Sequence, residues 1–222
     1  MDELTLGDFE ENQNSIYAKI RGGWKEVLGK GIPVAELPEH IGYVVVLMYH
    51  DEEAELIERI GQQIDNIVPS IVQPKKLIHT GIAYKNGLEL NNERSDYFCD
   101  IVRAMDKGIP VENFLFNLLP SKDSVMVEGH PNIYFVDLAN QFQRLQEELA
   151  LPEETRLGRQ WGSHVTTNRF TGKGTPEDAA ELSTLVANTP IIGRAVPKGI
   201  MVGYQTLSPE GYRIDPIEFF PF

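Results

Sequence analysis

Two histidines in this sequence lie in segments that read as β-strands, where a buried strand would normally carry aliphatic side chains. His79 belongs to "KLIHTGIAYK" and His164 to "WGSHVTTNRF". Imidazole titrates near neutrality, so two such rings facing one cleft could serve as base and acid on a phosphoester without a metal ion. The histidine pair is therefore the first candidate for chemistry in this chain.

The neighbours of the two histidines differ. The period of two along a strand puts the Thr166 hydroxyl on the face of His164, within reach of a phosphate oxygen, and turns Arg169 away from that face. Beside His79 the corresponding position is Gly81, and Thr80 would point to the opposite side of an unbroken strand. Three interpretations are open. A bulge could turn Thr80 round, Gly81 could let a phosphate approach the backbone, or this half-site has lost part of its equipment.

The segment His164-Val165-Thr166-Thr167 resembles the His-x-Thr/Ser-x motif of the 2H phosphoesterase superfamily, which includes the RNA 2′,5′-ligase-like and cyclic phosphodiesterase families. The order of elements is also similar over roughly residues 41–222. The resemblance implies a bilobal α+β fold, in which two antiparallel sheets flanked by helices surround a central groove with pseudo-twofold symmetry. It also implies that His79 and His164 form a catalytic pair, with Thr166 and the Thr80-Gly81 segment holding the phosphate.

The chain shows a weak internal duplication. In the first half, the strand-like "GYVVVLMYH" and the helical "DEEAELIERIGQQIDNIV" precede the His79 strand. In the second half, "DSVMVEGHPNIYFVDL" reads as strand or hairpin and "LANQFQRLQEELAL" as an amphipathic helix before the His164 strand. A strand, a helix and a histidine strand thus occur twice, which is the pattern expected of two related lobes.

The remaining segments frame these two units. Thr175 and Pro176 mark the start of a helix in "TPEDAAELSTLVAN", and residues 198–222 predict a closing hairpin. A helix is possible over residues 94–106. Residues 1–40 are expected to form an N-terminal extension with a short helix weakened by two glycines, and residues 41–222 to form the two-lobed domain.

Charge limits the choice of ligand. The 222 residues include 33 acidic and 20 basic side chains, giving a formal net charge of −13. This argues against a protein that follows a long phosphate backbone by electrostatic attraction. It favours a small nucleotide or a short oligonucleotide with a cyclic or 2′,5′-linked phosphate, held in one local basic pocket.

No cofactor or metal is expected. The His50-Asp51-Glu52 run lacks a second histidine four residues on, and the single Cys99 can build neither a cysteine-based zinc site nor an internal disulfide. The acidic start lacks the features of a secretory signal, so a cytoplasmic location is expected, and no membrane partner is expected. Oligomeric state is not predicted.

The leading interpretation is a metal-independent phosphodiesterase that uses His79 and His164. Tyr204 could stack on a base, although a core role is the more ordinary one for a tyrosine. His50 and His130 are interpreted as a strand-end residue and a surface residue. The alternative is a protein on the same scaffold that binds or sequesters a cyclic nucleotide without converting it, suggested by the imperfect first motif. A third possibility is an interaction protein in which the histidines only connect the sheets.

Overall fold

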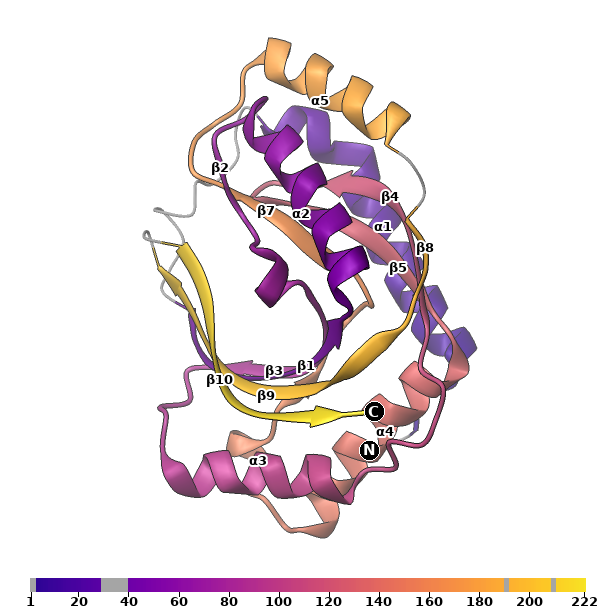
Figure 1. Ribbon diagram of the computed structural model, residues 1–222, viewed down its shortest axis with the longest axis vertical. Helices are drawn as coiled ribbons and strands as arrows, with labels where there is room; N and C mark the ends of the chain where they lie inside the picture. The colour runs from indigo at the N-terminus through magenta and orange to yellow at the C-terminus, as the bar shows by residue number, and fades with distance from the viewer. Residues whose placement is uncertain (1–2, 29–39, 190–191, 209–210) are drawn as a thin grey trace.

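The strands form two antiparallel sheets, and the helices pack against them (Figure 1). A groove lies between the two sheets. The computed structural model describes residues 3–28, 40–189, 192–208 and 211–222. Residues 29–39, within the expected N-terminal extension, lie outside the described part. Among the described residues, no helix is long and apolar enough to cross a membrane.

The first sheet has five strands in the order β10-β9-β1-β3-β6. Its strands are β1 (His40–Tyr49), β3 (His79–Asn86), β6 (Gly158–Arg159), β9 (Pro197–Ser208) and β10 (Gly211–Pro221). The second sheet has the order β2-β7-β5-β4-β8. Its strands are β2 (Ser70–Val72), β4 (Asn113–Pro120), β5 (Ser124–Pro131), β7 (Val165–Phe170) and β8 (Gly193–Ala195). Every pairing is antiparallel.

Two helices pack on the sheet opposite to the one that contains their preceding strand. The helix α2 (Asp51–Asp65) follows β1 of the first sheet but packs on the second sheet, and α4 (Ile133–Glu148) follows β5 of the second sheet but packs on the first (Figure 1). The short strands exchange in the same way. β2 precedes β3 and pairs with β7, whereas β6 precedes β7 and pairs with β3. The duplication expected from the sequence is therefore present as two interlocked lobes.

Two hydrophobic cores lie on the outer faces of the sheets. The core of the first sheet packs β1, β3 and β9 against α3 (Asn92–Ala104) and α4. The core of the second sheet packs β4, β5 and β7 against α2 and α5 (Pro176–Asn188). Thr175 caps α5 in a capping box with Asp178, as its sequence predicts. Because helices cover the outer faces, the inner faces remain for the groove.

The first helix, α1 (Leu6–Leu28), is longer than its glycines predict and belongs to the packed structure. Phe9 and Tyr17 are buried, Phe9 in the core of the first sheet and Tyr17 against Leu119 and Met126 of the second. Tertiary contacts outweigh the low helix propensity of glycine here.

Most predicted elements are confirmed, including the strand of His79, α2, α5 and the closing hairpin; the second predicted strand begins at Val165, directly after His164. One part was wrong: residues 133–138, read as strand or hairpin, form the first turns of α4. Asn132 accepts a hydrogen bond from the Phe135 amide and so starts the helix directly after β5. The strand β4 was not foreseen.

Candidate functional site

The groove between the sheets contains a cavity of about 380 Å³ that both histidines line. β3 contributes His79 and Gly81 to its wall, β7 contributes Thr166, and His164 reaches the cavity from the position just before β7. Arg169 of β7 and Tyr212 of β10 complete the surroundings of the two rings. The cavity therefore joins residues 79–81 of one lobe to residues 164–169 of the other, as the histidine pairing requires.

The ring of His79 is held in one orientation. Its Nδ1 lies 2.6 Å from the Leu77 carbonyl oxygen, which can only accept, so in the neutral ring Nδ1 carries the proton. This leaves Nε2 as the unprotonated nitrogen. The Tyr212 ring stacks on His79 with centroids 6.1 Å apart. A carbonyl and an aromatic ring thus fix the tautomer and the plane of a potential base.

His164 lies immediately before β7 rather than inside it, because the strand begins at Val165. The Trp161 ring stacks on His164, with centroids 4.4 Å apart and planes 24° apart. The Nδ1 atom of His164 is buried and has no hydrogen-bond partner among the described residues. Each histidine is therefore backed by one aromatic ring, although only His79 has its Nδ1 tied to a carbonyl.

Both imidazoles are held neutral. Burial lowers the pKa of His79 to about 4, a shift that the hydrogen bond to Leu77 partly offsets and the positive charge of Arg169 adds to. The pKa of His164 is lowered to about 3, mainly by burial and to a smaller extent by His79 and then by the positive charge of Arg169. Both rings line the same cavity, with Arg169 beside them. At neutral pH the site therefore offers an incoming ligand two neutral imidazoles beside the cations Arg169 and Lys122.

Arg169 lies in the groove, which corrects its assignment to the opposite face. The pairing of β5 with β7 shifts between Val125 and Met126, leaving Thr167 as the extra residue of a bulge. The bulge reverses the alternation, so Arg169 joins His164 and Thr166 at the cavity. An ideal strand could not predict this, because one inserted residue changes the face of everything that follows.

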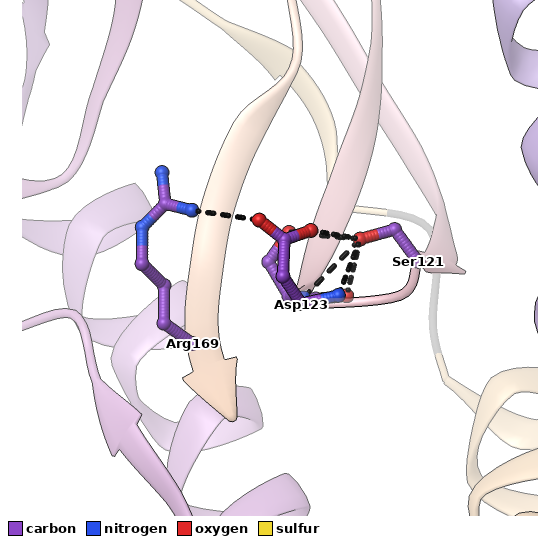
Figure 2. Close-up of polar contacts among 4 residues, drawn as sticks. Ser121, Asp123 and Arg169 are labelled. Atoms are coloured by element: carbon purple, nitrogen blue, oxygen red, sulfur yellow. Dashed lines mark hydrogen bonds and ion pairs between the residues drawn. The ribbon is translucent and has the colours of Figure 1, made fainter. Parts of the chain in front are cut away.

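The Arg169 guanidinium points toward the carboxylate of Asp123 (Figure 2), with Nη1 and Oδ2 3.5 Å apart. On its other side, Asp123 accepts a hydrogen bond of 3.0 Å from the Ser121 hydroxyl. The guanidinium carbon also lies 5.5 Å from the centre of the Tyr212 ring. The Arg169 Nε is buried without a hydrogen-bond partner among the described residues, so the cation keeps donor capacity for an anion in the cavity.

Thr80 points away from the cavity, and the expectation that it holds the phosphate is corrected. Its strand does contain a bulge, but the extra residue is Ile82, beyond Gly81, so Thr80 is not turned round. The buried Thr80 hydroxyl lies 2.7 Å from the Tyr49 hydroxyl and 3.3 Å from the Ser163 carbonyl. Asn113 Nδ2 donates to the same carbonyl at 2.7 Å. The residue after His79 is therefore hydrogen-bonded to the residue before His164.

Gly81 does face the cavity, and another side chain covers it. A Cβ built on Gly81 would lie 3.2 Å from Cγ and 3.3 Å from Cδ of Gln160. Gln160 lines the same cavity, and its backbone amide donates to the Ile82 carbonyl at 3.0 Å. The carboxamide of Gln160 thus occupies the space where the motif would place a hydroxyl on residue 81.

The other sequence candidates lie elsewhere. Tyr204 is packed edge-on against Tyr43 on the helix-covered face and donates to the Leu88 carbonyl, so its assignment to the ligand is corrected. His50 is exposed at the start of α2 and makes no side-chain cap. His130 was expected at the surface in a turn, but it lies half-buried in β5 with its ring stacked on Phe116. Among the described residues, no group of three or more His, Cys, Asp or Glu side chains could hold a metal ion.

Several cavity residues had no signal in the sequence. Trp161 and Gln160 come from the irregular segment before β7, and Tyr212 comes from a hairpin strand distant in the chain. Lys122 lies in the turn between β4 and β5. None of them shares a periodic pattern with the histidines. For Trp161 and Arg169, the one available signal was that an aromatic and a cationic residue lie close to His164 in the chain.

The two lobes form the predicted α+β fold, in which two antiparallel sheets lie on either side of one groove and each lobe supplies a histidine segment to it. The chain is similar to TT0787 of Thermus thermophilus, with a TM-score of 0.61 and 14% identity over 81% of this chain and 97% of that one. It is also similar to Escherichia coli LigT in its apo form, with a TM-score of 0.57 and 11% identity over 84% of this chain and 99% of that one.

LigT complexed with 3′-AMP is similar as well, with a TM-score of 0.54 and 12% identity over 82% of this chain and 98% of that one. No family model matches the sequence, and no curated protein matches it either. The structural likeness to TT0787 and LigT confirms, at the level of the fold, the resemblance drawn from residues 164–167.

The buried cluster around Thr80 yields a first prediction. Thr80→Val removes the hydroxyl without changing the side-chain shape, and we expect it to lower the free energy of unfolding by about 1–3 kcal/mol in urea denaturation. Thr80→Ser should retain most of the stability. Thr184→Val, which removes an exposed threonine hydroxyl from α5, is the matched control and should change stability by less than about 0.5 kcal/mol. Equal effects at residues 80 and 184 would contradict the proposed role of the cluster.

The lowered histidine pKa values yield a second prediction. The unfolded chain takes up protons near pH 6.5, whereas the native rings do so only near pH 4 and 3. Stability from these rings is therefore complete above about pH 6.5 and is lost as the pH falls toward 3, by up to roughly 1.4 kcal/mol per pH unit and ring. His164→Asn should flatten this slope in urea unfolding curves recorded between pH 7 and pH 3. Parallel slopes for the variant and the unaltered protein would refute the shift.

Proposed function

We propose that this protein is a metal-independent phosphodiesterase of the two-histidine type, acting on a cyclic or 2′,5′-linked phosphate in a small nucleotide or short oligonucleotide. The observation that carries the proposal is the shared cavity: two neutral imidazoles from separate lobes line it together with one arginine. LigT, whose fold this chain shares, is known in complex with 3′-AMP. A phosphate-bearing nucleotide is therefore the ligand that we assign to this cavity.

The proposed reaction needs one ring as base and the other as acid. On a 2′,3′-cyclic phosphate, one histidine takes a proton from water as the water oxygen bonds to phosphorus. The other histidine gives a proton to the ribose oxygen as its bond to phosphorus breaks. An entering phosphate anion raises the pKa of nearby imidazoles, which supplies the protonated ring that the reaction needs. His79 suits the base role because its Nε2 is unprotonated in the neutral ring.

Three groups are proposed to hold the phosphate. Arg169 supplies the positive charge, and Thr166 supplies a hydroxyl on the His164 side. On the His79 side, where Gly81 has no hydroxyl, the Gln160 carboxamide would donate to a phosphate oxygen instead. The imperfect first motif would then be completed by a residue from the opposite half of the chain. Such donors stabilise the charge that builds on the phosphate oxygens in the transition state.

A third prediction tests the histidine pair. His79→Ala and His164→Ala should each lower turnover of a 2′,3′-cyclic nucleotide by about 10²–10⁴-fold, because each removes one proton transfer. The unaltered protein should keep its activity in a chelator such as EDTA. Rates are measured by chromatography of the products, with His50→Ala as the control for removal of an exposed histidine. Near-normal turnover in both groove variants would overturn the proposal.

A second candidate function is a binding protein that does not convert its ligand, and the glycine at residue 81 favours it. Calorimetric titration with the same cyclic nucleotide separates the candidates. Saturable binding without product at any pH supports the binding protein, and product formation supports the enzyme.

A fourth prediction concerns Gln160. Gln160→Ala should lower kcat/KM about 10-fold, since it removes one proposed donor to the phosphate. Gln160→Glu should lower it further, because a carboxylate repels the phosphate. In the Gln160→Ala background, Gly81→Thr should restore activity, because the atoms nearest to a Cβ at residue 81 all belong to the Gln160 side chain. Unchanged kcat/KM in Gln160→Ala would contradict this role.

A further inference from the structure

A second cavity of about 460 Å³ opens beside the first, on the His164 side. The two cavities share six lining residues, namely Lys122, Asp123, Trp161, His164, Thr166 and Arg169. His164 and Thr166 therefore stand at the boundary between two hollows and not at the end of one. A group bonded to a phosphate at this boundary could extend in either direction.

The outer wall of the second cavity is α1. Lys19, Ile20 and Gly23 line it from one side of that helix. The helix is fixed to the rest of the site: Gln13 Oε1 accepts from the Ser163 amide at 3.0 Å, and Arg21 pairs at 2.6 Å with Glu128, which is 1% exposed. The wall is thus held directly against the residue that precedes His164.

The second cavity has the chemistry of a nucleoside site. Ile20 and Met126 offer an apolar surface beside Trp161, which suits a flat base. Lys19 and Lys122 add positive charges beside Arg169 in a chain with a net charge of −13. The one acid in the lining, Asp123, is already bound to Arg169 and Ser121. A base with an attached phosphate or ribose matches this combination.

We infer that this α1-walled cavity binds a second nucleoside, on the far side of the reacting phosphate from the nucleoside in the first cavity. The inference rests on the proposed function and specifies that a linear diester joining two nucleosides is a substrate in addition to the cyclic phosphate. The ribose hydroxyl next to the linkage attacks phosphorus and gives its proton to one histidine. The bond from phosphorus to the second nucleoside breaks, and the other histidine protonates the departing oxygen. The products are a cyclic phosphate and a free nucleoside.

Adjacent glycines on α1 provide the test. A Cβ on Gly23 or on Gly22 meets no described atom within 4 Å, but only Gly23 lines the second cavity. Gly23→Glu places bulk and negative charge inside the cavity, and Gly22→Glu adds the same side chain at an exposed position. Both replace a helical glycine, so neither should lower the melting temperature.

We expect Gly23→Glu to lower kcat/KM for 2′,5′-linked adenylyl-adenosine by at least about 10-fold, through steric exclusion and repulsion of the phosphate. Its effect on adenosine 2′,3′-cyclic phosphate should stay below about twofold, because that substrate leaves the second cavity empty. Gly22→Glu should behave like the unaltered protein with both substrates. Equal effects of the two glycine variants, or equal losses with both substrates, would overturn the inference.

A binding measurement separates this inference from the proposed function. In the full chain carrying His164→Asn, calorimetry should show that the linked dinucleotide binds more tightly than 3′-AMP and that Gly23→Glu abolishes the difference. If the unaltered protein converts neither substrate but this difference is found, the second site stands and the enzymatic function falls. If both substrates are converted but the two ligands bind equally, the enzymatic function stands and the second site falls.

Discussion

The site depends on a buried hydrogen-bond cluster that connects the lobes behind the two histidines. Thr80 follows His79, Ser163 precedes His164, and the hydroxyl of the first lies 3.3 Å from the carbonyl of the second. Tyr49 hydrogen-bonds to the Thr80 hydroxyl, and Asn113 Nδ2 donates to Tyr49 and to the Ser163 carbonyl. Because an unpaired buried polar group is costly, these bonds favour the arrangement in which the residue after His79 contacts the residue before His164.

The two histidine segments share a second device. In each, the residue two positions after the histidine faces the cavity, and a bulge follows at the next position, Ile82 in one lobe and Thr167 in the other. Beyond each bulge the faces are reversed, which brings Tyr84 and Arg169 to the cavity from equivalent positions. The pseudo-twofold relation therefore extends from the topology to individual backbone irregularities. What differs is chemical: one lobe supplies Gly81 where the other supplies Thr166.

Local patterns in the sequence predicted that two histidine segments occur in related halves of the chain. They also predicted the capped α5 and the side of the strand on which Thr166 lies. They could not predict Arg169, because a bulge is set by the neighbouring strand rather than by the residues around it. They could not predict the orientation of the Thr80 side chain either, because its hydroxyl bonds to Ser163, 83 positions away. β4 was unreadable because Asn117, with a φ of 58°, interrupts its alternation.

The exchange of α2 and α4 between the sheets has a consequence for how the molecule comes apart. Each core is covered in part by a helix whose own preceding strand belongs to the opposite sheet, so each half of the chain supplies part of the hydrophobic interior of the other. Each half therefore depends on the other to cover its core. Loosening one half exposes apolar surface of the other, so the two imidazoles line one cavity only when both halves are folded.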